Sequence, residues 1–196
     1  MHLISTFPSD LSEEPALLRR PVDDPVWNNI CRKVQKRYAF FDGSTRQILA
    51  SLASMITSLI HLLDPVMDEL CKRTCRFCSD ICCVGSEVYY NETDLFYFAA
   101  CGKGYPRGQT RRTGEVSLCR YWYPCFGCLL PRSQRPYTCT WFICSDQSQL
   151  LETLFKPRDI RRINASFESI RRLRLILSSI FMKSGDLGYE FSKLLE

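Results

Sequence analysis

Histidine and long hydrophobic runs are both scarce in this 196-residue chain. The only histidines are His2 and His61. The longest apolar stretch, residues 48–63, is interrupted by polar side chains, whereas a transmembrane helix needs about 20 consecutive apolar residues. The sequence therefore predicts no membrane span. It also offers no recognisable nucleophile–base or acid–base pair, because those sites most often depend on histidine.

Residues 1–24 lack the features of a secretory signal. They have no basic start, and Pro8 and Pro15 interrupt any apolar run of the kind a signal peptide needs. We therefore expect a cytoplasmic protein whose cysteines stay reduced. The formal net charge of +5 is modest and does not by itself indicate a nucleic-acid or membrane partner.

Length and composition indicate a single domain over residues 1–196. Hydrophobic residues make up 45% of the sequence and charged residues 24%, which is enough apolar material for one core and excludes low-complexity disorder. Residues 1–43 carry four prolines followed by a basic stretch. This segment is expected to be a lead-in with few structural demands.

A long amphipathic helix is predicted over residues 44–63. Apolar side chains recur there at steps of three and four residues. Ser44 and Gln47 have the S-x-x-Q spacing of a capping box, which would start the helix. Pro65 is expected to end it, because proline disfavours helical geometry in the residue before it.

Two further helices are predicted toward the middle and the end of the chain. Residues 159–184 repeat the apolar spacing of a long amphipathic helix, with Gly185 as its stop. A short helix is expected over 92–101, since Asn91 and Asp94 suit a helix start and the following glycine suits a stop. The predicted fold class is therefore mainly α.

Cysteine is concentrated between the two long helices. Eleven of the twelve cysteines fall between Cys71 and Cys144, in a segment that glycine and proline break too often for long regular elements. Thiolates that converge on a metal can contribute about 10 kcal/mol or more of folding free energy. We therefore expect two long amphipathic helices around an irregular, metal-organised cysteine-rich region over residues 71–144.

The cysteines form two clusters with the spacing of metal ligands. The first is CKRTCRFCSDICC, beginning at Cys71, and the second runs from Cys119 to Cys144 and contains a C-x2-C pair at Cys125 and Cys128. Both histidines lie outside these clusters, so an all-sulfur site is expected rather than a Cys2His2 finger. Sulfur ligation favours zinc or an iron–sulfur cluster.

The order of the cysteines resembles the YkgJ-type cysteine-cluster family, described as a zinc- or iron-chelating domain. The first family element is a C-x2-C pair followed closely by a double cysteine. The second is a cysteine, a Gly-Cys, an Arg-Pro and a further cysteine. The residues similar to these elements are Cys75, Cys78, Cys82, Cys83, Cys119, Gly127, Cys128, Arg135, Pro136 and Cys139, with Cys144 close to a frequent final cysteine.

The resemblance implies metal or iron–sulfur binding, since most members of the family have no assigned reaction. We expect a 4Fe-4S cluster, with zinc as the alternative, and a redox or electron-transfer role. The implied metal ligands are Cys75, Cys78, Cys82, Cys83, Cys119, Cys128, Cys139 and Cys144. Eight thiolates would suffice for two four-ligand sites, or for one cluster with the remaining thiols structural.

Other interpretations remain open. Cys71, Cys75 and Cys78 have the C-x3-C-x2-C spacing of radical S-adenosylmethionine enzymes, and a related cysteine cluster occurs in flagellin lysine methylases. An iron–sulfur methyl- or group-transfer enzyme is therefore one alternative. A zinc-stabilised interaction module and a disulfide scaffold are the others. For Cys31 and Cys101 we expect ordinary buried thiols.

Two basic runs could bind an anionic partner such as RNA, although the modest net charge favours solvated surfaces. The first run lies on a glycine-containing loop and the second lies on the predicted C-terminal helix. Their residues are Lys103, Arg107, Arg111 and Arg112, then Arg158, Arg161, Arg162, Arg171, Arg172 and Arg174.

Overall fold

The fold is mainly α, as the sequence predicts. The computed structural model describes residues 24–75, 77–78, 81–83, 88–109, 118–123 and 127–182. Its helices are α2 (Pro25–Phe40), α3 (Gly43–Arg73), α4 (Glu92–Cys101), α5 (Thr138–Trp141), α6 (Ser145–Leu154) and α7 (Pro157–Met182), with a 3-10 turn η1 (Arg132–Gln134). Strands β1 (Trp122–Tyr123) and β2 (Gly127–Cys128) pair antiparallel, with Trp122 opposite Cys128.

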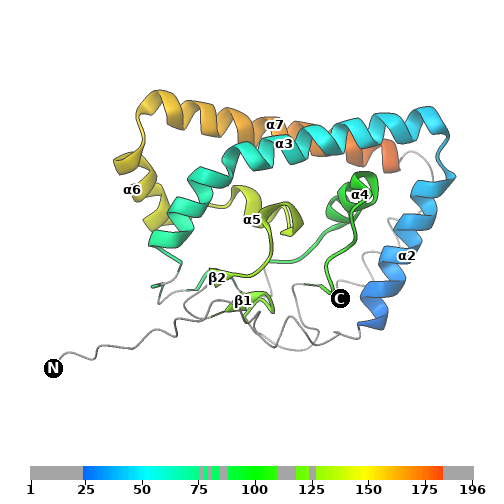
Figure 1. Cartoon of the computed structure of the whole chain (residues 1–196), viewed down its shortest axis with the longest axis horizontal. Helices are drawn as coiled ribbons and strands as arrows, with labels where there is room; N and C mark the ends of the chain where they lie inside the picture. The colour runs from blue at the N-terminus through cyan, green and yellow to red at the C-terminus, as the bar shows by residue number, and fades with distance from the viewer. Residues whose placement is uncertain are drawn as a thin grey trace.

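The two longest helices, α3 and α7, run side by side in opposite directions and form one layer (Figure 1). Helix α4 packs against both of them, and α2 closes one end of the molecule. At the centre of the core, the rings of Phe96 and Phe181 stack with 4.2 Å between centroids. The predicted helix over 159–184 is thus α7, although residues 183 and 184 and Gly185 lie outside the described part of the chain.

Helix α3 begins one residue earlier than predicted and uses a different cap. The side chain of Asp42 accepts hydrogen bonds from the backbone N–H of Thr45 at 2.9 Å and from the hydroxyl groups of Ser44 and Thr45. The predicted Ser44–Gln47 capping box is therefore wrong. An aspartate oxygen can satisfy several of the unpaired N–H and O–H donors of the first turn at once.

Helix α3 also continues past Pro65 to Arg73, so the predicted stop at Pro65 is wrong. An interior proline removes one helical hydrogen bond and costs about 3 kcal/mol. Beyond it, however, Met67 and Leu70 are fully buried and Val66 packs on the core. Burying each such side chain contributes about 1.5–3 kcal/mol, which is enough to outweigh the proline.

Helix α2 lies within the segment expected to be a lead-in. The side chain of Asp24 accepts from the backbone N–H of Trp27 at 2.9 Å, and Pro25 occupies the first helical position. Trp27, Ile30 and Val34 fall on one face and are buried in the core. The expectation of few structural demands is wrong for residues 25–40, because an acidic cap followed by proline is itself a helix-start signal.

Helix α4 confirms its prediction at both ends. Asn91 and Asp94 form a reciprocal capping box, in which each side chain accepts from the backbone N–H of the other residue at 3.0 and 2.9 Å. Gly102 ends the helix with φ of 63°, a left-handed conformation that glycine adopts without steric cost. Short local signals therefore suffice where both caps are present in the sequence.

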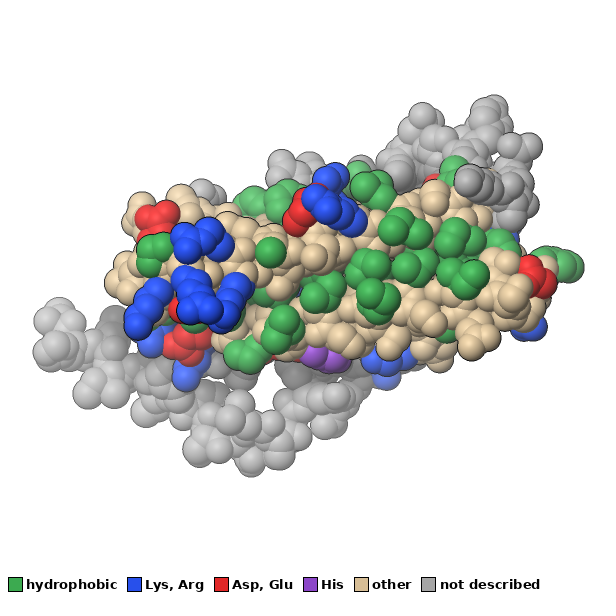
Figure 2. Space-filling model, turned by 90° about the horizontal axis from the view of Figure 1, so that it is seen from above, with side chains coloured by type: hydrophobic (Ala, Val, Ile, Leu, Met, Phe, Trp, Pro, Cys, Tyr) green, Lys and Arg blue, Asp and Glu red, His purple; other side chains and the backbone are tan. Residues whose placement is uncertain are grey.

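The outer face of the α3–α7 layer carries different kinds of side chain at its two ends (Figure 2). Hydrophobic side chains gather toward the end nearer α2, whereas lysine and arginine gather toward the opposite end. By length and composition alone α3 could cross a membrane, but seven of its side chains are buried in the core of this fold. The exposed apolar residues of the layer are Ile48, Met55, Leu62, Leu175, Ile176 and Met182.

Candidate metal centre

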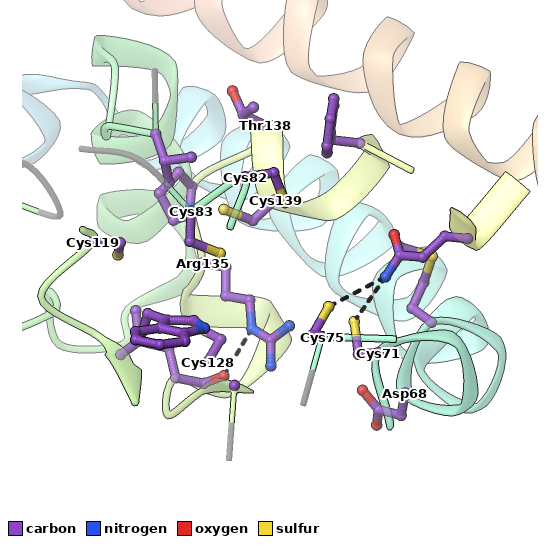
Figure 3. Close-up of a pocket in the computed structure, with 18 of the residues that line it drawn as sticks. Asp68, Cys71, Cys75, Cys82, Cys83, Cys119, Cys128, Arg135, Thr138 and Cys139 are labelled. Carbon is purple, nitrogen blue, oxygen red and sulfur yellow. Dashed lines mark hydrogen bonds between the residues drawn. The ribbon is translucent and has the colours of Figure 1, made fainter. Parts of the chain in front are cut away.

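A cavity of about 220 Å³ lies beside the C-terminal end of α3, where the cysteine-rich segments meet helices α5 and α6 (Figure 3). Its lining includes thiols from five separate stretches of the chain. The cysteines that line it are Cys71, Cys75, Cys82, Cys83, Cys119, Cys128 and Cys139. The fold thus brings together residues that are far apart in the sequence and surrounds one cavity with sulfur.

Six of the eight ligands implied by the resemblance line this cavity. The other two, Cys78 and Cys144, are outside its described lining, and Cys125 is outside the described residues. Cys71 lines the cavity although it is not among the implied ligands. Its position four residues before Cys75 is a usable signal, because residues spaced by four lie on the same face of a helix, and α3 extends through Cys71.

Cys71 and Cys75 lie together at one side of the cavity (Figure 3). A hydrogen bond between the two sulfurs lowers the pKa of Cys71 to about 5, with burial opposing and the charge of Arg132 assisting the shift. The same hydrogen bond, together with burial, raises the pKa of Cys75. The lowered pKa of Cys71 favours its thiolate, the form that binds metals.

The remaining thiols lie on the other side of the cavity. A hydrogen bond to Cys82, then burial and the nearby sulfurs of Cys139 and Cys128, raises the pKa of Cys83. Burial first, and neighbouring sulfurs second, raise the pKa of Cys139, and burial is the largest cause of the raised pKa of Cys119. These thiols are protonated at neutral pH, and each must lose a proton to bind a metal.

Arg135 places a positive charge among the sulfurs. Its Nε donates to the carbonyl oxygen of Leu130 at 2.9 Å, and its side chain lies between Cys83 and Cys71 in Figure 3. Burial lowers the pKa of the guanidinium, but the sulfurs of Cys128, Cys71 and Cys139 outweigh that effect and raise it. Arg135 therefore stays charged and can balance negative charge on the thiolates.

The segment that carries Arg135 is fixed to α3 by a second arginine. The side chain of Arg132 is buried, and its guanidinium lies 3.1 Å from a carboxylate oxygen of Asp64 and 2.5 Å from one of Asp68. Asp64 also contacts the Nδ1 of His61, an exposed side chain of α3, at 2.8 Å. These contacts hold η1 against the end of α3 that provides Cys71.

A buried ion pair positions the short helix α5 that carries Cys139. One oxygen of Asp94 accepts from Arg174 at 2.6 Å and from the backbone N–H of Tyr137 at 3.1 Å. The guanidinium of Arg174 also lies over the Tyr137 ring, 4.3 Å from its centroid. Helices α4 and α7 therefore both hold the residue at the start of α5.

Several members of the predicted basic runs thus have structural roles or local partners. Arg174 is buried with Asp94, whereas Arg171 and Arg172 both donate to Glu168 at the helix surface. Arg111 and Arg112 lie outside the described residues. On the described part of α7, Arg171 and Arg172 are exposed, whereas Arg174 is buried.

The thiol donors suit soft metals, and the spacing of their sulfurs affects which metal group they can hold. Four thiolates around one zinc lie about 2.3 Å from the metal, so their sulfurs must converge closely. Among the described residues, no three histidine, cysteine or carboxylate side chains converge on one point. The sulfurs of the seven lining cysteines lie around the cavity.

Metal binding at this site is expected to release protons and to strengthen as pH rises. The pKa values of Cys75, Cys83, Cys119 and Cys139 are raised in the metal-free protein, so their protons must leave when sulfur binds metal. Calorimetry in buffers of different ionisation enthalpy measures the protons released. An affinity that does not change between pH 6 and 8 would contradict this thiol set.

No protein-family model, curated protein or solved structure matches this chain. The resemblance to the YkgJ-type family therefore depends on the order of the cysteines and the Arg-Pro pair alone.

Proposed function

We propose that this protein binds a metal centre of the YkgJ type through the thiolates of the cavity, with a 4Fe-4S cluster as the first candidate and zinc as the alternative. The observation that carries the proposal is the gathering of seven cysteines around one cavity. Cysteine thiolates are the usual ligands of both groups. When bound, an iron–sulfur cluster would supply one-electron redox chemistry.

The size of the cavity and the separation of its sulfurs favour the cluster over a single ion. The cysteines on the two sides of a cavity of about 220 Å³ would supply thiolates to a cluster, whose several iron atoms would not require four sulfurs to meet at one ion. The guanidinium of Arg135 would offset part of the negative charge that four thiolates bring to such a cluster. Charge and hydrogen bonds near the sulfurs are among the features that set cluster potentials.

Apolar side chains form part of the cavity wall and suit a redox role. Met67, Val88, Trp122, Leu130 and Phe142 line it beside the sulfurs. A hydrophobic shell limits access of water and thereby tunes the reduction potential of a metal site. We therefore propose electron transfer as the work of the loaded protein, in a cytoplasmic setting.

The radical S-adenosylmethionine interpretation gains less support. It requires Cys71, Cys75 and Cys78 on one cluster, and Cys78 is not part of the described cavity lining. Its usual scaffold is an array of strands and helices, whereas β1 and β2, each of two residues, are the strands in the described part of this chain. Saturable binding of S-adenosylmethionine to the loaded protein would restore this alternative.

The test of the proposed function is the metal and acid-labile sulfide content of protein purified without oxygen or chelator, together with its visible absorption spectrum. Iron and sulfide in near-equal amounts with a broad charge-transfer band are the expected result. Zinc without sulfide would select the alternative and point to a structural or interaction role. Protein that carries no metal and takes up neither iron with sulfide nor zinc would overturn the proposal.

A further inference from the structure

We propose that Gln147 is a positioning residue of this metal centre, whose amide N–H groups hold the sulfurs of Cys71 and Cys75 in place for metal binding. The inference rests on the proposed function and extends it, because it assigns a role to a residue that the cysteine pattern does not include. Gln147 lies on α6, outside both cysteine clusters of the sequence.

The contacts of Gln147 are unusual for a glutamine on a short surface helix. Its side chain is 4% exposed and lines the cavity. Its Nε2 lies 3.6 Å from the sulfur of Cys71 and 3.4 Å from the sulfur of Cys75, as the dashed lines in Figure 3 show. Both are distances at which an amide N–H can donate to sulfur.

The other end of the amide explains why its nitrogen faces the sulfurs. The backbone N–H of Cys144, the residue before α6, donates to the Oε1 of Gln147 at 3.4 Å. This contact gives the oxygen a donor at the start of the helix and turns the NH2 group toward the cavity. Cys144 therefore contributes to the site through its backbone, although its side chain is outside the described lining.

The amide nitrogen of Gln147 can donate hydrogen bonds to thiolates and has no lone pair to offer a cation. An amide NH2 group has two donor hydrogens and no acceptor on nitrogen, so it can donate to both sulfurs at once. Hydrogen bonds to a charged acceptor are about twice as strong as those between neutral groups. Gln147 thus fixes the direction of both sulfurs before a metal arrives.

The test compares Gln147→Met with the matched control Gln149→Met, which changes an exposed glutamine of the same helix. Cobalt(II) is titrated anaerobically into each metal-free protein, and competition with a chelator gives the affinity. Removing a residue that orients metal ligands weakens metal binding by about 10–100-fold, and we expect that loss for Gln147→Met together with a shift of the thiolate-to-cobalt absorption bands. Gln149→Met is expected to match the wild type.

A second variant separates donation from packing. Gln147→Glu has nearly the same shape as the wild type but places a negative charge against the sulfurs, so its cobalt affinity should fall at least as far as that of Gln147→Met. Wild-type affinity and band positions in both variants would overturn the role of Gln147 and leave the proposed function standing. A wild-type protein that gives no thiolate-to-cobalt bands and takes up neither zinc nor iron with sulfide would overturn the proposed function, and this inference with it.

Discussion

Cys128→Ser protein is expected to lose its metal and to melt at the temperature of the metal-free wild type. Cys128 lines the cavity, and its sulfur lies close enough to Cys83 and Cys139 to shift their pKa values. Serine keeps nearly the same shape but does not provide a thiolate. Structural thiolate–metal sites contribute about 10 kcal/mol or more of folding free energy. The difference in melting temperature between the wild type and Cys128→Ser should therefore be large, and it should disappear when metal is withheld from both proteins.

The matched control for this prediction is Cys101→Ser. Cys101 is half-buried against the core at the end of α4, and its sulfur lies 3.7 Å from the Oγ1 of Thr57. It is outside the described lining of the cavity, so this variant should keep its full metal content. Full metal content and an unchanged melting curve in Cys128→Ser would remove Cys128 from the ligand set.

Arg174→Met is expected to lower the free energy of unfolding by about 3–5 kcal/mol, because it leaves the carboxylate of Asp94 buried without its cation. Burial already raises the pKa of Asp94 more than Arg174 lowers it, so this pair is costly to bury even when complete. Urea denaturation of the metal-free protein measures the effect. The exposed neighbour Arg172→Met should change stability by less than about 0.5 kcal/mol.

The double variant Asp94→Asn with Arg174→Met distinguishes charge from packing. Removing both charges avoids the uncompensated carboxylate, so much of the lost stability should return. The backbone N–H of Tyr137 would still have an amide oxygen to donate to, which keeps α5 near its position. A double variant as unstable as Arg174→Met alone would show that the side chain of Arg174 acts mainly through packing on Tyr137.

Local signals in the sequence are sufficient to predict some elements of the fold. Helix α4 is predicted correctly because its caps, Asn91 with Asp94 and Gly102, act within a few residues. The end of α3 is not, because the side chains that outweigh Pro65 are buried by distant parts of the chain. Burial in the core decides whether a helix continues past a proline. The spacing of apolar residues alone does not show which helix face a distant segment covers.

The candidate site is predictable to a similar extent. The family resemblance implies six of the seven thiols that line the cavity, whereas Cys71 belongs to the first cluster but reaches the cavity through the extension of α3 beyond Pro65. Gln147 and Arg174 cannot be found in this way. A glutamine gives no metal-binding signal in a sequence, and Arg174 differs from the other arginines of its basic run only through the contact with Asp94 that the fold creates.

The packing of α3 against α6 and α7 brings together the chain segments that form the cavity. A long stretch of chain separates Cys71 from Cys139. Bringing the two ends of such a stretch together carries an entropic cost that grows with its length. Here the packing of helices brings the two ends of this stretch together, since α7 and α6 both contact α3. An incoming metal therefore meets ends that are already close. Its uptake should be limited by deprotonation and local rearrangement of thiols rather than by a search of the whole chain for its ligands.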